Sequence, residues 1–232
     1  MQLEDRPIHF SVELIHPPAV HPRHALQKLY YDVSQTKAAY DNTDFSQPKQ
    51  ARFFSRRGPK AQSIVVFLPD RLVILEEWVD ISLSNYLDKI QELGRRVMTD
   101  LGVARIVAEA VTLRTTFALT NFADARIFLL EQVCQQADRI LPFFQRPLAT
   151  GGLRFVFPET PEHPGTLHVL IESYRHSQNE VFVEVKGVFG NCAITTENIA
   201  QVNEHVQLCR RFVTNHIFPF LNQYDVPQTK PA

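Results

Sequence analysis

The sequence predicts an α+β protein in which one β-α-β-β-β-α plan occurs twice. In Ser63–Leu101, two apolar runs joined by Pro69-Asp70 indicate a hairpin, and a long amphipathic helix follows at once. The same order of hairpin and long helix recurs in Thr166–Asn222. These two matching stretches are the main support for a duplicated plan.

Short sequence matches link the two halves, and their separation grows from 102 to 115 residues after the longer loop of the second hairpin. Arg52-Phe53 corresponds to Arg154-Phe155, and paired arginines occupy matching points of the two long helices, at Arg95-Arg96 and Arg210-Arg211. The two repeats are expected to form one structural unit. We therefore expect a first repeat at 1–103, a second repeat at 104–224 and a disordered tail at 225–232.

The first half carries the patterns of a strand, a helix, three further strands and a second helix. Apolar residues from Ile8 to Leu14 alternate with polar ones, which is typical of a half-buried strand. His16-Pro17-Pro18 ends that strand, since proline has no N–H for the ladder, and the apolar stripe of Arg23–Gln35 predicts a helix. The remaining elements are expected as a strand at Ala51–Arg56, a hairpin at Ser63–Trp78 and a helix that begins after Asp80 or Ser82 and ends at Gly102.

The second half follows the same order. Arg105–Leu119 predicts a long strand, and Asp124 is a candidate N-cap for a helix at Ala125–Arg139. A proline-containing loop then leads to a strand at Leu153–Phe157. The last elements are expected as strands at Thr166–Tyr174 and Glu180–Gly187 and a helix from Thr195 to about Asn222, bent or ended near Pro219.

This duplicated order resembles the TATA-box-binding-protein fold in topology and length. The resemblance implies that the two halves form one curved antiparallel sheet, with helices packed on its convex face and the concave face open. A helix-grip fold, in which a sheet wraps one long helix, is the alternative, although this chain has two long-helix patterns. The opening RPIHFSVELIHPP also resembles the start of a sporadic bacterial protein family of uncharacterised activity, and so it implies no function.

Composition and charge argue against several classes of function. The net charge of −1 and a pI near 6.8 give no overall attraction to nucleic acid or to an anionic membrane. No apolar run reaches the roughly 20 residues that a membrane-spanning helix needs, and the first residues lack a signal-peptide pattern. Three cysteines without C-x-x-C spacing predict neither a disulfide framework nor a zinc site. We expect a cytoplasmic protein without a metal or other cofactor.

The face of the sheet that the helices leave open is the expected functional surface. In the first hairpin we place Val65, Phe67, Val73 and Leu75 on that face, which makes it strongly apolar. Exposed apolar patches of this kind mark binding surfaces, so we expect a protein partner or a second copy of the chain there. A loop such as Thr36–Lys49 covering the patch is the alternative. The second hairpin is expected to present a mixed polar and apolar face of His168, Leu170, Glu172, Phe182, Glu184 and Lys186.

A nucleic-acid-binding saddle is a second hypothesis for the same face. Such a surface needs basic residues for phosphates and apolar wedges between bases. The candidate wedges are Phe53, Phe54 and Phe155, and the candidate phosphate contacts are Arg52, Arg56, Arg57, Lys60 and Arg154. The strands also carry acids that would repel phosphate, namely Glu13, Glu76, Glu77, Glu109, Glu172 and Glu184.

A small-ligand or enzyme site is a third hypothesis, centred on His168, Glu172 and Glu184. These side chains could form an acid–base group if the strand register brings them together. The sequence has no phosphate-binding loop, nucleophile elbow or zinc-protease motif. His16, His21 and His24 have no ligand spacing typical of zinc. The sequence therefore favours a non-catalytic binding or assembly module.

Overall fold

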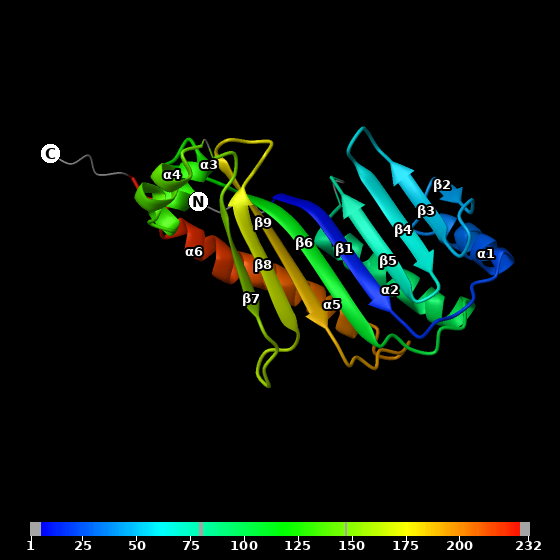
Figure 1. The fold of residues 1–232 in the computed structure, drawn as a ribbon. Coiled ribbons are helices and arrows are strands. Elements are labelled where there is room, and N and C mark those ends of the chain that lie inside the picture. The colour runs from blue at the N-terminus through cyan, green and yellow to red at the C-terminus, as the bar shows by residue number, and fades with distance from the viewer. Residues whose placement is uncertain (1–5, 79–80, 147, 228–232) are drawn as a thin grey trace.

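The computed structural model describes residues 6–78, 81–146 and 148–227. In these residues nine strands form one curved, open antiparallel sheet in the order β2-β3-β4-β5-β1-β6-β9-β8-β7 (Figure 1). The expected α+β class and single curved antiparallel sheet are therefore confirmed. The strands are β1 (Arg6–Ile15), β2 (Asn42–Asp44), β3 (Ala51–Arg56), β4 (Gln62–Leu68), β5 (Arg71–Glu77), β6 (Ala108–Ala118), β7 (Gly152–Phe157), β8 (Thr166–Ser173) and β9 (Glu180–Phe189).

The strand order is symmetric about the central pair, β1 and β6. Outward from β1 come β5, β4 and β3, and outward from β6 come β9, β8 and β7. The short strand β2 adds one further edge on the first side. The internal duplication itself stays a prediction, as do the repeat boundaries.

Helices cover one side of the sheet, which we call the helix side, and α2 and α5 lie behind the strands in Figure 1. Ser82 caps α2, because its hydroxyl accepts a hydrogen bond from Asn85 N at 3.2 Å. The other candidate cap, Asp80, lies outside the described residues. The helices are α1 (Arg23–Ser34), α2 (Leu83–Asp100), α3 (Ala125–Ile127), α4 (Ala137–Phe144), α5 (Ala200–Phe212) and α6 (Phe218–Asn222), with π-helical turns η1 (Phe128–Val133) and η2 (Val213–Ile217).

The helix expected at Ala125–Arg139 is interrupted. Asp124 does cap its start, accepting from Arg126 N at 2.8 Å, but the chain passes through η1 and then turns at Gln135, where φ is +53°. A new helix, α4, then runs into the segment expected as a loop and includes Pro142. A positive φ at a glutamine is not encoded by an apolar stripe, so periodicity alone missed this break.

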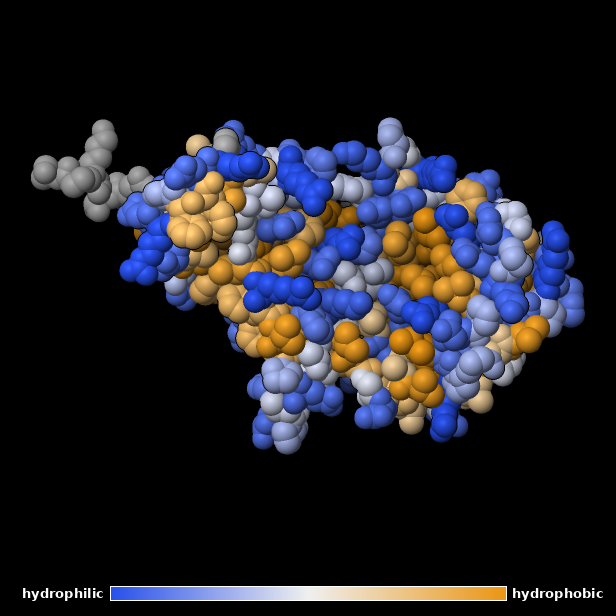
Figure 2. Space-filling model, viewed as in Figure 1, coloured by the Kyte–Doolittle hydropathy of each residue, from blue (hydrophilic) through white to orange (hydrophobic). Residues whose placement is uncertain are grey.

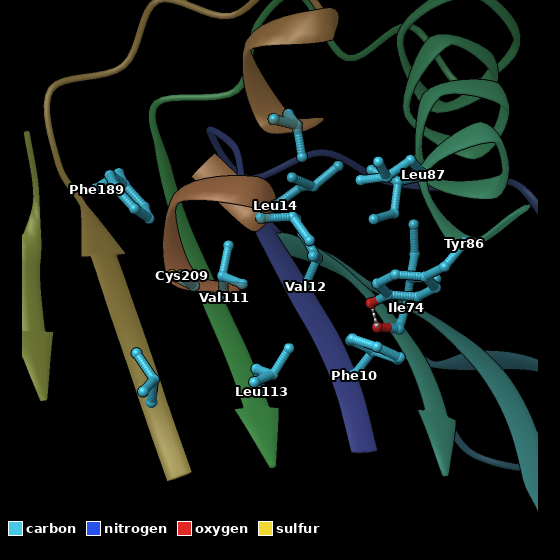
Figure 3. Close-up of a cluster of buried hydrophobic side chains, with 14 of the residues drawn as sticks. Phe10, Val12, Leu14, Ile74, Tyr86, Leu87, Val111, Leu113, Phe189 and Cys209 are labelled. Carbon is cyan, nitrogen blue, oxygen red and sulfur yellow. Dashed lines mark hydrogen bonds between the residues drawn. The ribbon is translucent and has the colours of Figure 1, made fainter. Parts of the chain in front are cut away.

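The hydrophobic core lies between the sheet and the long helices (Figure 3). Phe10 of β1 stacks on Tyr86 of α2 with ring centroids 5.2 Å apart, and the Tyr86 hydroxyl donates to Ile74 O at 3.1 Å. The helices α2 and α5 approach closely at Gly94. A Cβ there would lie 2.9 Å from Ile199 Cδ1, so a side chain at this position would require the end of the Ile199 side chain to move.

The register of the first hairpin corrects one sequence expectation. The two-residue turn Pro69-Asp70 sets Val65 opposite Ile74 and Phe67 opposite Leu72. Residues directly opposite each other share a sheet face, so Val65 and Phe67 point to the helix side. They are 0% and 2% exposed, and their expected place on the open face was wrong.

The second hairpin has the faces that its alternation predicts. Val169 lies opposite Val185 and Ile171 opposite Val183, and all four side chains are buried on the helix side. The residues expected on the open side of β8 and β9 are paired there, with His168 opposite Lys186, Leu170 opposite Glu184 and Glu172 opposite Phe182.

The ordered chain continues past the expected end of the second repeat. Asp225 is 7% exposed, and its carboxylate accepts hydrogen bonds from Thr120 N at 2.6 Å and Asn121 N at 2.8 Å. Asp225 therefore does not belong to a disordered tail. Residues 228–232 of that expected tail lie outside the described residues.

Candidate binding surface on the open sheet side

The open side of the first half is not covered by the loop that could have covered it. Tyr40 and Phe45 of that loop each pack against Phe53, with ring centroids 6.4 Å apart. Phe53 is fully buried on the helix side, where Tyr30 of α1 also contacts it at 5.2 Å. The loop therefore belongs to the helix side and leaves the open side of β4 and β5 free.

An apolar patch occupies this open side. Ile64 lies opposite Leu75 and Val66 lies opposite Val73, so four aliphatic side chains meet across β4 and β5. Each is partly exposed. Phe54 of β3 lies opposite Ile64 and extends the cluster by one strand. We call Phe54, Ile64, Val66, Val73 and Leu75 the first-half patch, and Figure 2 shows an orange area over these strands.

Two arginines flank the aromatic member of the first-half patch. The guanidinium carbons of Arg52 and Arg56 lie 5.8 and 5.6 Å from the centroid of the Phe54 ring. Guanidinium groups over an aromatic face are a favourable cation–π arrangement. The patch therefore has a positively charged border on its β3 side.

A band of charged and polar residues crosses the middle of the open side. Arg71 pairs with Glu13 at 3.1 Å, and Arg114 pairs with Glu184 at 2.6 Å. His9 lies 3.8 Å from Glu77, and its Nε2 is 3.0 Å from the Ser11 hydroxyl. Burial, with a smaller contribution from Arg114, lowers the pKa of His9 to about 4, so the ring is neutral at pH 7.

A shallow hollow of about 370 Å³ lies where the two halves meet on this side. Glu172 and Glu184 both line it, but His168 does not, because His168 lies between Lys186 and Val156. Two of the three residues of the predicted acid–base group thus line the hollow, and the third lies outside it. The residues that line the hollow include His9, Glu77, Trp78, Arg114, Tyr174 and Phe182.

The candidate nucleic-acid residues do not share one surface. Phe53 cannot act as a wedge, since it is fully buried, and Phe54 takes the open position beside Arg52 and Arg56. Of the two neighbouring candidate wedges, alternation along Arg52–Arg56 selects Phe54 for the open side. Arg57 and Lys60 lie at the β3–β4 turn, and Arg154 is on β7 at the far end of the sheet.

Two of the strand acids point away from the open side. Glu76 and Glu109 are 2% and 0% exposed on the helix side, whereas Glu13, Glu77, Glu172 and Glu184 remain on the open side. Four acids along these strands still oppose phosphate binding there.

Glu76 belongs to a buried polar cluster beneath α2 that sequence reasoning missed. Lys89 Nζ lies 2.6 Å from Glu76 Oε1 and donates to Ser63 Oγ at 2.9 Å, and Ser63 Oγ donates to the same carboxylate oxygen at 2.7 Å. Lys89 is 8% exposed, so the charge is paired rather than solvated. This cluster lies at the base of a cavity of about 400 Å³ on the helix side.

A second buried pair lies beneath α5. His205 Nδ1 is 2.8 Å from Glu109 Oε2, and the His205 ring stacks on Phe189 with centroids 3.9 Å apart. Burial raises the pKa of Glu109, and the contact with His205 opposes that shift. In each buried pair a helix residue contacts a strand residue. Helical periodicity does not predict which strand residue that is.

The described residues contain no cluster of three potential metal ligands among His, Cys, Asp and Glu. The rings of His16 and His21 lie edge to face at 5.6 Å without a third ligand. Among the described helices, none is long and apolar enough to cross a membrane.

No known protein-family model matches this sequence, and no curated protein is significantly similar to it. The functional argument therefore depends on the surface itself.

Proposed function

We propose that this chain is a non-catalytic protein-binding or assembly module that holds another protein chain on the open side of its sheet. The first-half patch is the observation that supports this most strongly. Its aliphatic side chains lie directly opposite each other on β4 and β5, and the nearby loop packs elsewhere. Contiguous apolar side chains on an uncovered sheet are typical of a binding surface.

The surroundings of the first-half patch fit a protein partner. Interfaces commonly have an apolar centre within a polar and charged rim. Here Arg52 and Arg56 border the patch on one side, and Glu13, Arg71 and Glu77 border it on the other. The resemblance to the TATA-box-binding-protein fold and a cytoplasmic, bacterial setting belong to this proposal as well. The three cysteines, free in the structure, are compatible with a reducing compartment.

The experiment is quantitative capture of bound proteins with the native chain and with Val73→Glu/Leu75→Glu. Binding of the partner would bury the two introduced carboxylates at a large desolvation cost. Capture of a specific partner should therefore fall at least tenfold. The matched control is Gln207→Glu/Asn215→Glu, which adds the same charge at exposed positions on the helix side. Equal capture by all three chains would contradict the proposal.

A nucleic-acid-binding saddle is the second candidate, favoured by the position of Phe54 between two arginines. Aromatic faces flanked by guanidinium groups can stack on bases. This candidate predicts that short duplexes or single strands bind with a steep salt dependence and that Phe54→Ala weakens the binding. No binding at low salt would eliminate it.

A further inference from the structure

The two edges of the sheet differ in how well they are protected. On one edge, β2 has only three residues, all polar (Asn42, Thr43 and Asp44). On the other edge, β7 has six residues and, within the described part of the chain, pairs only with β8. Short polar edge strands resist further pairing, whereas longer apolar ones invite it.

The edge strand β7 is also unusually exposed for its composition. Phe155, Val156 and Phe157 are 38%, 52% and 43% exposed, and they point alternately to the two sides of the sheet. Phe155 and Phe157 share one side, with ring centroids 6.2 Å apart. Both sides of β7 therefore expose apolar side chains to water.

The outer edge of β7 specifies the shape of its occupant. Every second residue of an edge strand directs its N–H and C=O away from the sheet, and only another extended strand can pair with the whole row. Strand addition of this kind is a common mode of protein recognition. The remaining question is which strand fits.

We propose that β7 pairs antiparallel with β7 of a second copy of this chain, with Phe155 on the two-fold axis. In a regular antiparallel pair of identical strands, one residue lies opposite itself. Centring on Arg154 would set two guanidinium groups opposite each other, which is destabilising. Centring on Val156 would bring Pro158, which has no N–H, into the ladder.

Centring on Phe155 keeps the two arginines apart and pairs Leu153–Phe157 with its own copy, so Pro158 falls only opposite Gly152, at the end of β7. It sets Arg154 opposite the partner's Val156 and Leu153 opposite the partner's Phe157. Phe155 and Phe157 of both copies then form one aromatic cluster on the helix side, where cross-strand aromatic pairs are favourable. Self-complementarity of Leu153–Phe157 therefore favours a second copy over an unrelated strand.

The dimer has a defined consequence for the sheet. A two-fold axis perpendicular to the sheet keeps the same side of each copy facing the same way, so the two nine-stranded sheets form one continuous sheet. The open sides of both copies then lie on one surface. This pairing does not depend on what the first-half patch binds.

The experiment is a charge exchange at the two-fold axis, measured by sedimentation equilibrium. The native chain is expected at twice its mass of 26.7 kDa. Phe155→Lys and Phe155→Glu are each expected to be monomers, because like charges would face each other. An equimolar mixture of the two should recover the dimer, since Lys would then lie opposite Glu. The control is Asn42→Lys on the opposite edge, which should stay dimeric.

Three results would overturn the proposal: a native chain that is monomeric at about 0.1 mM, single variants that still dimerise, or a mixture that stays monomeric. Circular dichroism checks that each variant is folded. We expect all of them to fold, because Phe155 is partly exposed. The proposed function is tested separately. Val73→Glu/Leu75→Glu should reduce partner capture and leave the β7 dimer intact, so either proposal can fail without the other.

Discussion

The hairpins β4–β5 and β8–β9 have similar helix sides and different open sides. Both bury apolar side chains beneath a long helix, with Val65 and Ile74 in the first and Val169 and Val185 in the second. On the open side, the first hairpin presents only aliphatic side chains at its centre, whereas the second sets His168 opposite Lys186 and Leu170 opposite Glu184. Packing beneath the helices dictates the apolar residues on the helix sides, whereas the residues on the open sides are free to differ. The difference between the open sides is therefore where a binding function is best sought.

The helix sides also differ in their buried polar pairs. Lys89 and Glu76 form a hydrogen-bonded ion pair beneath α2, and Glu109 and His205 form a pair beneath α5. The predictions below test these contrasts.

Lys89→Met should lower the free energy of unfolding by about 3–5 kcal/mol, because it leaves the Glu76 carboxylate buried without its counter-charge. Urea unfolding measures this effect. Adding Glu76→Leu should recover most of the loss, since the orphaned charge is removed as well. A single-variant cost below about 1 kcal/mol would show that the pair is hydrated rather than buried.

The two sides of the first hairpin should respond very differently to truncation. Phe67→Ala should cost about 3–5 kcal/mol, because it opens a cavity in the core. Leu75→Ala on the partly exposed open side should cost about 1 kcal/mol or less. Similar costs for both would contradict the assignment of the faces.

His9 should make the protein less stable in acid. Its pKa is about 4 in the folded chain and about 6.5 when unfolded, so as the pH falls the unfolded state takes up the proton first. This contribution to stability is fully present above pH 6.5 and is lost between pH 6.5 and 4, by about 3 kcal/mol. His9→Gln should flatten that part of the curve of unfolding free energy against pH. An unchanged slope would assign the acid sensitivity to other groups.

Much of the fold could be predicted from alternation and helical periodicity, but the faces of the first hairpin required register. The turn Pro69-Asp70 has two residues, so Leu68 pairs with Arg71 and each odd-numbered residue of β4 lies opposite an even-numbered residue of β5. That arithmetic was available in the sequence, and it separates Val65 from Val73. The same alternation selects Phe54 rather than Phe53 for the open side.

Other features of the candidate surface could not be predicted from local pattern. His9 meets Arg114 only because β1 lies beside β6, and a register shift between Pro7 and His9 sets which residues face each other. The separation of His168 from Glu184 likewise depends on strand pairing. Long-range strand order is a property of the whole chain, so no single segment encodes it.

The most direct test of the proposed function compares two matched leucines on the open side. A photo-crosslinking residue would replace Leu75 in the first-half patch or Leu170 on β8, in cells that make the protein. We expect the probe at position 75 to form a specific crosslink to another protein chain and the probe at position 170 to give only background. Identical products from both positions, or none from position 75, would contradict a binding role for the first-half patch.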